Sequence, residues 1–192
     1  MNLSHEEVVN ICYRHELWLN GEGGCRAVFT GCLNDMNLWE FNLSDADFSE
    51  CELNAVRMPY NLSRACFKGA QLTNMSFDNS ICNETDFTEA KLFLVNFSSC
   101  IMNHALFNKA HLRACNFHAV NLRSCQLKIF HSYVWTAYIG PRYTSIGCQF
   151  YSNKMWKSFD DERIARMSFS ALDYWNENKN IIFMLMDSFK VK

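Results

Sequence analysis

Residues 62–101 read LSRAC-FKGAQ-LTNMS-FDNSI-CNETD-FTEAK-LFLVN-FSSCI, and seven of these eight groups begin with Leu or Phe. The five-residue spacing extends back to Leu33 and forward to Leu127, with one residue missing near Pro59, where we expect a distorted corner. A period this short is typical of a solenoid, in which successive turns of the chain stack and share one core. The sequence therefore predicts a rod whose interior is filled by the Leu and Phe side chains.

A second pattern lies within each group. A small side chain stands two positions before the Leu or Phe, and a mostly polar residue separates the two, as in Ala46-Asp47-Phe48. Alternation of inward and outward side chains is the pattern of a β-strand. We therefore predict short strand-like segments joined by tight corners.

These groups resemble the A(D/N)LXX unit of pentapeptide-repeat proteins, as in residues 46–50 (ADFSE) and 120–124 (VNLRS). The resemblance implies an all-β solenoid, a right-handed quadrilateral β-helix with four units in each coil and therefore about five coils. Residues twenty apart should then stack on one another. One predicted column contains Phe67, Phe87 and Phe107.

The chain divides into three predicted regions. Residues 1–24 should form an N-terminal capping helix and turn, because Ser4 and Glu7 make a capping box. Residues 25–130 carry the repeats, and residues 131–192 should form a C-terminal β/α tail. The helix is expected to cover the apolar end of the first coil.

The predicted tail combines a hairpin with helical segments. Residues rich in β-branched and aromatic side chains flank Gly140-Pro141, and residues 158–176 have helical spacing. Residues 146–175 also resemble the C-terminal region of pentapeptide-repeat proteins encoded by tailed phages and prophages, which implies a viral accessory protein. The last apolar segment is predicted either to cap the rod or to form a homodimer, through Ile181, Ile182, Phe183 and Leu185.

Composition narrows the classes of function. The longest apolar run is the six residues 181–186, so we expect no membrane span and a cytoplasmic protein. Half of the ten cysteines fall at inward positions of the repeat and none forms a CxxC pair, which favours packing over disulfides or zinc. The three histidines His104, His111 and His118 are seven apart and should lie on different faces. We therefore predict no catalytic, cofactor-binding or metal-binding residues.

Charge is distributed unevenly along the chain. Residues 1–89 hold 14 acidic and 5 basic side chains, whereas residues 90–159 hold 8 basic and no acidic ones. The family resemblance implies DNA mimicry, in which a negatively charged rod occupies the DNA groove of an enzyme such as a type II topoisomerase. Only the acidic half fits this mechanism, and its candidate partner-binding residues are Asp35, Glu40, Asp45, Asp47, Glu50 and Glu52.

The basic half favours the opposite contact, with nucleic acid or with an acidic protein. Its charge density is modest, so an ordinary solvated face is the favoured interpretation. Head-to-tail association of two copies is a third interpretation. The candidate basic residues are Lys91, Lys109, Arg113, Arg123 and Lys128.

Apolar residues also occupy outward positions of the repeat. Ile81 and Ile101 share one outward column, and Leu106 lies at the outward position of the next face. Clustered outward apolar residues are typical of protein interfaces. The alternative is that the C-terminal tail folds back and covers them.

Together these patterns predict a non-enzymatic binding protein, phage-derived, that docks on a host protein. The expected partners are DNA-handling or anti-phage defence enzymes, by analogy with the family. Direct nucleic-acid binding through the basic half and a purely structural or assembly role are the two alternatives.

Overall fold

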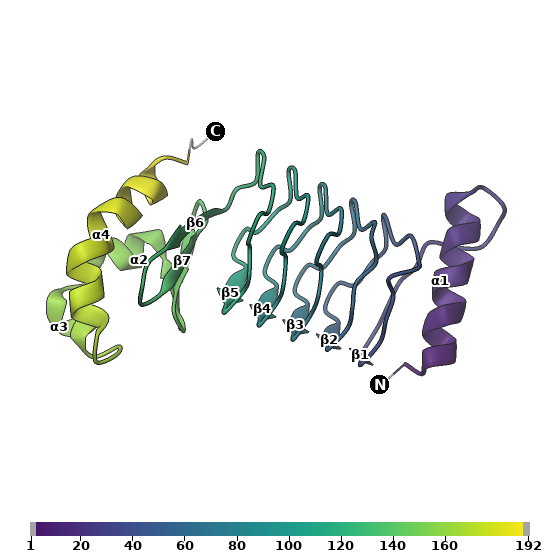
Figure 1. Cartoon of the computed structure of the whole chain (residues 1–192), viewed down its shortest axis with the longest axis horizontal. Coiled ribbons are helices and arrows are strands. Elements are labelled where there is room, and N and C mark those ends of the chain that lie inside the picture. The colour runs from purple at the N-terminus through teal and green to yellow at the C-terminus, as the bar shows by residue number, and fades with distance from the viewer. Residues whose placement is uncertain (1–2, 190–192) are drawn as a thin grey trace. The chain divides into compact units, whose positions relative to one another are not determined.

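The computed structural model describes residues 3–189 and divides the chain after Cys125 into two compact units (Figure 1). The first unit holds one helix and the stacked strands, and the second holds an antiparallel sheet with three helices. No helix in the described part of the chain is both long and apolar enough to cross a membrane.

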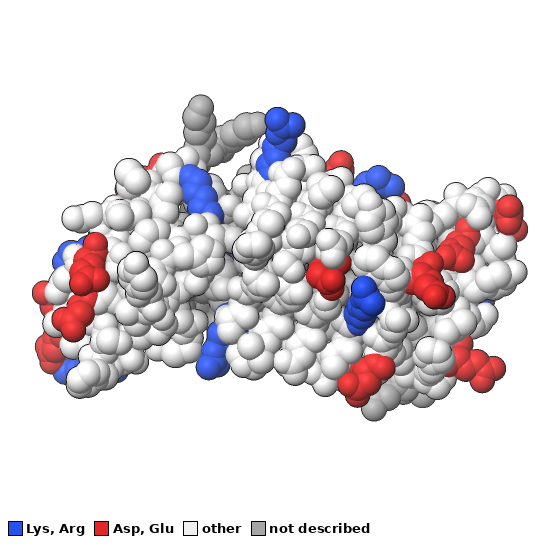
Figure 2. All heavy atoms as spheres, viewed as in Figure 1, with Lys and Arg blue, Asp and Glu red and all other residues white. Residues whose placement is uncertain are grey.

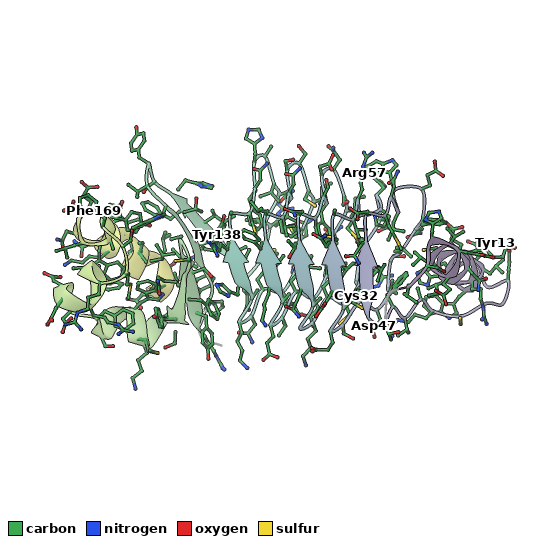
Figure 3. All side chains as sticks on the ribbon, turned by 90° about the horizontal axis from the view of Figure 1, so that it is seen from below. Tyr13, Cys32, Asp47, Arg57, Tyr138 and Phe169 are labelled. Atoms are coloured by element: carbon green, nitrogen blue, oxygen red, sulfur yellow. The ribbon has the colours of Figure 1, made fainter. Side chains whose placement is uncertain are left out.

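Five short parallel strands stack on one side of the first unit, here named the strand face (Figure 3). Each strand pairs with the next so that the central leucines are aligned, Leu33 with Leu53 at one end and Leu92 with Leu112 at the other. Parallel bridges continue this ladder around the rest of each turn. The strands are β1 (Cys32–Asn34), β2 (Glu52–Asn54), β3 (Gln71–Thr73), β4 (Lys91–Phe93) and β5 (His111–Arg113).

The Leu and Phe side chains fill the interior, as the repeat predicts. Phe87 stacks between Phe67 and Phe107, with ring centroids 5.2 and 5.0 Å apart. The predicted column is therefore confirmed, and so is the β-solenoid fold. The solenoid has about 4 turns, slightly fewer than the five coils predicted from the number of repeats.

The corners give the repeat its period of five. Non-glycine residues with positive φ recur two positions after the Leu or Phe, for example Asp45 at 64° and Arg64 at 61°. A type II turn requires positive φ at its third residue. The backbone N–H of Ala46 closes such a turn by donating to the carbonyl oxygen of Leu43 at 3.2 Å.

The residue missing near Pro59 is a corner residue. Asn37 and Arg57 are bridged before this point and are 20 apart, whereas Asn42 and Asn61 are bridged across it and are 19 apart. A bridge of 19 residues also joins Val28 to Asp47 in the first turn. The spacing returns to 20 beyond the corner. The turn that contains Pro59 is thus one residue short while its ladder continues, which confirms the predicted distortion.

The N-terminal helix α1 (His5–Leu19) begins with the predicted capping box. The backbone N–H of Ser4 donates to the Glu7 carboxylate at 2.8 Å, and the Glu7 N–H donates to the Ser4 hydroxyl at 3.3 Å. These bonds satisfy N–H groups that a helix start leaves unpaired. They fix where α1 begins.

His15 joins α1 to the first turn of the β-helix. Its Nδ1 accepts a hydrogen bond from the N–H of Ala27 at 3.0 Å, so its proton is on Nε2, which donates to the Ser44 carbonyl oxygen at 2.8 Å. The side chain is fully buried, and this burial lowers the pKa of His15. Trp18, three residues further along the same helix, is 40% exposed.

The small inward position of the repeat carries hydrogen-bond donors as well as packing groups. The thiol of Cys51 donates to the carbonyl oxygen of Phe29 at 3.1 Å, and the hydroxyl of Ser80 donates to the Pro59 carbonyl oxygen at 2.8 Å. Burial raises the pKa of Cys51 to about 11, so this thiol stays protonated and able to donate. The cysteines expected only to pack therefore also tie one turn to the preceding one.

The second unit contains a four-stranded antiparallel sheet in sequence order. The hairpin predicted around Gly140-Pro141 is confirmed, because its two strands pair directly. The outer strands were not predicted. The four strands are β6 (Lys128–His131), β7 (Thr136–Ile139), β8 (Tyr143–Ile146) and β9 (Gln149–Ser152).

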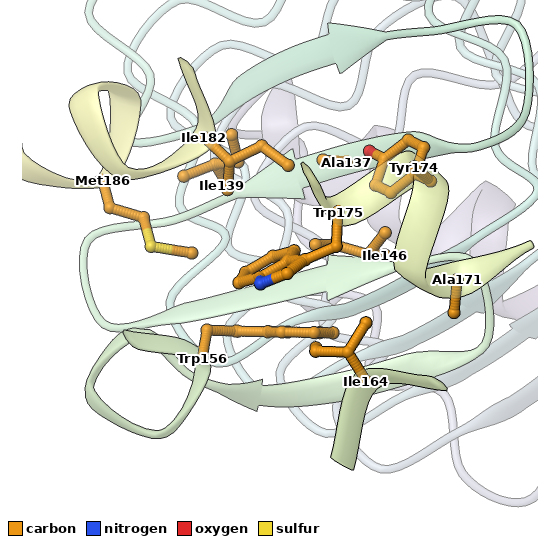
Figure 4. Close-up of a cluster of buried hydrophobic side chains, with 10 residues drawn as sticks. All are labelled: Ala137, Ile139, Ile146, Trp156, Ile164, Ala171, Tyr174, Trp175, Ile182 and Met186. Atoms are coloured by element: carbon orange, nitrogen blue, oxygen red, sulfur yellow. The ribbon is translucent and has the colours of Figure 1, made fainter. Parts of the chain in front are cut away.

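Three helices pack with this sheet around one apolar core (Figure 4). They are α2 (Asn153–Ser158), α3 (Asp161–Ala165) and α4 (Ala171–Asp187). The single helix predicted over residues 158–176 is wrong, because the chain leaves helical geometry twice. Asp160 caps α3 by accepting the N–H of Arg163 at 2.8 Å, and a serine-rich segment at residues 168–170 separates α3 from α4.

Candidate interaction surface of the β-helix

Two neighbouring sides of the β-helix carry the outward apolar residues. On one side, parallel bridges join Asn61, Ile81, Ile101 and Asn121 in sequence, and we name it the Ile101 face. The next side along the chain bridges Asp86 to Leu106, and we name it the Leu106 face. Each face therefore presents a column of side chains on consecutive turns.

Ile81, Ile101 and Leu106 form the apolar patch of these two faces. Ile101 is 38% exposed and Leu106 is 44% exposed, while Ile81 is half-buried. Ile81 and Ile101 are bridge partners, so they lie on adjacent turns. The first pair is thus brought together as predicted, and Leu106 lies across the corner occupied by His104, whose φ of 60° turns the chain between the faces.

A second exposed apolar pair lies elsewhere on the turn. Phe93 ends β4 and Leu94 forms the following corner, where φ is 55°. The Leu94 corner follows the strand face, whereas the His104 corner lies between the Ile101 face and the Leu106 face. The two apolar groups are therefore separate surfaces.

The six acidic candidates do not share one face. They span positions 35–52 and therefore almost one twenty-residue turn, so successive members fall on successive sides. Figure 2 shows acidic side chains scattered over the visible side of the first unit, with a denser group on the second unit. Within the set, Asp45 is held by two hydrogen bonds of 2.7 and 2.6 Å from Arg64, which lower the pKa of its carboxyl group. Asp47 lies 3.5 Å from Arg26.

The five basic candidates are likewise dispersed. Lys91 and Arg113 lie on β4 and β5 of the strand face, and with Phe93 they line one shallow hollow. Lys109 is a corner residue whose ammonium group lies 2.6 Å from the Glu89 carboxylate. Arg123 follows the Ile101 face, and Lys128 belongs to the second unit. Lys109, Arg123 and Lys128 therefore do not extend the pair on the strand face into a continuous basic strip.

The apolar C-terminal candidates all lie on α4, which settles that this segment is a helix. Ile182 is fully buried in the core of the second unit, and Phe183 and Leu185 pack against that core. Ile181 is 42% exposed. Most of this segment therefore stabilises its own unit, and Ile181 is the member with the most surface left for a further contact.

The histidines and cysteines form no shared centre. His104 lies at a corner, His111 on β5 and His118 beyond the bridge residue Asn116, which confirms that the three point from different sides. Within residues 3–189, no three His, Cys, Asp or Glu side chains gather in a way that could hold a metal ion.

One surface group was missed in the sequence. The guanidinium of Arg57 lies 4.5 Å from the ring centre of Trp39, and the Tyr60 ring packs edge-on against the same indole at 6.1 Å. Arg57 follows Trp39 by 18 residues, close to one turn, so the twenty-residue stacking rule places them on adjacent turns. Applying that rule to outward positions, and not only to the core, would have found the group.

Comparison with known proteins supports the repeat assignment. Residues 61–92 and 90–128 match the family model described as pentapeptide repeats, in 8 copies. No curated protein sequence matches the chain. Pentapeptide-repeat proteins generally act as non-enzymatic interaction or structural scaffolds.

Three solved structures resemble part of the chain. A pentapeptide repeat protein from the thylakoid lumen of Arabidopsis thaliana is 20% identical over 48% of this chain and 61% of its own, with a TM-score of 0.34. A pentapeptide repeat protein from the cyanobacterium Cyanothece is 16% identical over 60% of this chain and 99% of its own, with a TM-score of 0.22. HetL, a pentapeptide repeat protein involved in heterocyst differentiation regulation in Nostoc, is 13% identical over 67% of this chain and 95% of its own, with a TM-score of 0.20.

The present chain covers less than two thirds of the first of these proteins. The match to the family model runs through the same turns whose corners and stacked columns are described above. Residues 61–128 of this chain thus match the pentapeptide-repeat family, which supports the assignment of the repeats.

Proposed function

We propose that this is a non-enzymatic binding protein, phage- or prophage-derived, that docks on a host protein through the apolar patch of its β-helix. DNA-handling machines and anti-phage defence enzymes are the expected class of partner. The phage origin is supported by the dispersed motif of residues 146–175, and the mode of action by analogy with the family.

The observation that carries the proposal is the exchange of polar for apolar side chains in two outward columns. The Ile101 face carries Asn61 and Asn121 on the turns that flank Ile81 and Ile101, and the Leu106 face carries Asp86 on the turn before Leu106. The polar residues show that neither column needs an apolar side chain to fold. A partner that covers the patch would bury apolar surface at about 25 cal/mol per Å².

The β-helix also presents this patch at little entropic cost. Parallel hydrogen bonds hold both columns, for example from the Ile101 N–H to the Ser80 carbonyl oxygen at 3.0 Å and from the Leu106 N–H to the Thr85 carbonyl oxygen at 2.9 Å. A surface ordered before binding loses less freedom when the partner arrives.

Partial DNA mimicry is a narrower form of the same proposal. Arg64 and Arg26 already neutralise Asp45 and Asp47. Mimicry would then depend on the remaining acidic side chains of the first turns, Asp35, Glu40, Glu50 and Glu52.

The experiment is capture of partners from bacterial lysate by the whole chain and by variants borrowed from its own ladder. The test variant combines Ile101→Asn with Leu106→Asp, because Asn121 and Asp86 occupy the same columns. The control is Leu94→Asn, because Asn74 forms the equivalent corner one turn earlier. We expect the wild type and the control to retain the same protein and the test variant to lose it.

Two outcomes would contradict the proposal. One is that the wild type captures no partner, and the other is that the captured protein binds the test variant as well as the control. The second outcome leaves a binding protein but removes the apolar patch as its site.

Nucleic-acid binding is the second candidate, favoured by the shared hollow of Lys91, Phe93 and Arg113 on the strand face. The guanidinium of Arg113 lies 5.1 Å from the Phe93 ring centre, so a base and a phosphate would meet an aromatic and two cations there. This candidate predicts an affinity that falls steeply with salt and weakens when Arg113 and Arg123 are changed to Glu. A salt-insensitive gel shift, or none, would remove it.

A further inference from the structure

The second unit contains a partly open cavity of about 170 Å³ that the repeat pattern does not predict. Its walls are mostly aromatic and aliphatic, and the main contributors are Trp135, Ile146, Trp156, Ile164, Tyr174 and Trp175. Several of these side chains are drawn together in Figure 4. All of the lining residues lie within this one unit.

Five separate elements supply the walls, which is why the cavity has a fixed shape. Ile146 ends β8, Gln149 begins β9, Trp156 lies on α2, Ile164 on α3 and Trp175 on α4. Each of these elements is anchored in the same buried core. A cavity formed in this way exists before any ligand arrives.

The indole rings are held in place by contacts of their own. The Nε1–H of Trp156 donates to the Thr144 carbonyl oxygen at 2.9 Å, and the Trp156 and Trp175 ring centres are 5.4 Å apart at 31°. Trp135 packs edge-on against Tyr174 at 5.1 Å. These contacts oppose collapse of the walls into the empty space.

The lining defines the chemistry of a fitting ligand. None of the lining residues carries a charge, so an ionised group would lose its hydration without a partner. Aromatic walls favour a planar ring through offset and edge contacts. An apolar protein cavity of about 150 Å³ takes up benzene. A polar edge is offered at one side by Ser168 and by Gln149, the first residue of β9.

We propose that this cavity is a binding site for a small, neutral aromatic molecule of one or two rings. The site is independent of the apolar patch, because it lies outside the repeats and shares no residue with them. It adds a ligand-binding function to a chain whose repeat interior is filled with side chains.

The test uses 19F NMR with the full chain and fluorobenzene as the probe. The test variant is Ala171→Leu, since Ala171 is buried and lines the cavity. The matched control is Ala165→Leu, since Ala165 is exposed at the end of α3 and is not a lining residue. We expect line broadening with the wild type and the control, and binding about tenfold weaker or more in Ala171→Leu because the added side chain fills the space.

Two further arms keep the test decisive. If near-UV circular dichroism shows that Ala171→Leu disturbs the fold, Ser168→Phe replaces it, because Ser168 is exposed at the edge of the cavity. The charged probe 4-fluorobenzoate should bind about tenfold more weakly than fluorobenzene. The proposal is overturned if fluorobenzene does not bind the wild type, if it binds the filled variant equally well, or if 4-fluorobenzoate binds as tightly.

Discussion

In the β-helix a buried side chain packs on its own counterpart one turn away, whereas in the C-terminal unit each buried side chain meets partners that occur once. Phe87 stacks between two phenylalanines of the same column. Trp156 instead contacts Tyr151, Phe159 and Trp175, which come from three different places in the unit. In the β-helix one sequence spacing produces the same contact on every turn. In the C-terminal unit each buried side chain must fit neighbours of a different shape.

The difference shows in how completely the two interiors are filled. The Leu and Phe side chains of the columns are almost completely buried, and two hollows of the repeats lie on the outer strand face. The C-terminal unit keeps an apolar cavity between its elements. Regular stacking thus favours an outer surface as the working part of the first unit, and irregular packing allows an inner site in the second.

The largest expected effect comes from breaking a column. Phe87→Ala removes a fully buried ring from the middle of its stack and should cost about 3–5 kcal/mol of unfolding free energy, because the turns above and below cannot close the cavity. Urea unfolding measures the loss. Hydrogen exchange should show the loss of protection within the repeats, since each turn depends on its neighbours.

The matched control for this change is Phe169→Ala in the C-terminal unit. Phe169 is fully exposed, so its removal should leave the unfolding free energy nearly unchanged. Equal costs for the two substitutions would show that the stacked column is not what stabilises the β-helix.

Sequence reasoning works where one rule governs many residues. The period of five predicted the columns, the strand-like segments and the shortened corner at Pro59. A wrong register would have conflicted with the sequence on every turn, so the correct one could be recognised. It failed at residues 158–176, where Asp160 begins a separate helix and the serines near residue 168 separate α3 from α4. No spacing reveals the cavity of the C-terminal unit, because its walls come from five elements whose packing depends on long-range contacts.

The candidate site was predictable to a similar degree. Spacing alone placed Ile81 beside Ile101, since both occupy one outward column. It grouped the six acidic residues by their proximity in sequence, although a chain that turns at every fifth residue sends neighbours to different sides. Two of them, Asp45 and Asp47, pair with Arg64 and Arg26, which lie about one turn away in the sequence.

The cap is the part of the first unit that does not repeat, and it offers the next test. His15→Ala removes the two hydrogen bonds that the imidazole makes to the first turn and should cost about 2–4 kcal/mol. His5→Ala is the control, because His5 is exposed on the same helix. Thermal unfolding of the two variants measures the difference, and an equal cost would contradict the anchoring role of His15.

The same residue predicts a pH dependence. Burial lowers the pKa of His15 in the folded chain, so the unfolded chain binds its proton more readily. Its contribution to stability is therefore fully present above the unfolded pKa of about 6.5 and is lost as the pH falls below that value. Asp45, Glu16 and Arg26 also act on this ring. Between pH 8 and pH 5 the free energy of unfolding should fall more steeply in the wild type than in His15→Gln. Parallel profiles would contradict the pH-dependent contribution of His15.

A smaller effect tests the hydrogen bonds at the small inward position. Cys51→Val should cost about 1 kcal/mol, because valine fits this position at Val56 and Val95 but cannot donate to the Phe29 carbonyl oxygen. Cys51→Ser should cost less, since Ser80 makes the same bond from the same position. Urea unfolding measures the free energy of unfolding of both variants. If Cys51→Ser is less stable than Cys51→Val, packing alone matters at this position.

The smallest effect reverses its sign between the two units. Ala119 forms a corner with φ of 53°, a conformation that costs an alanine about 1 kcal/mol and a glycine very little. Glycine also gives the unfolded chain more conformational freedom, which offsets part of this gain. Ala119→Gly should therefore stabilise the β-helix by about 0.5 kcal/mol. Ala165→Gly at the end of α3 should instead destabilise the C-terminal unit by roughly 0.5 kcal/mol, because helical geometry favours alanine. Thermal unfolding of the two variants measures both shifts. A loss of stability in both would mean that the corners of the repeat do not impose the left-handed conformation on which the five-residue period depends.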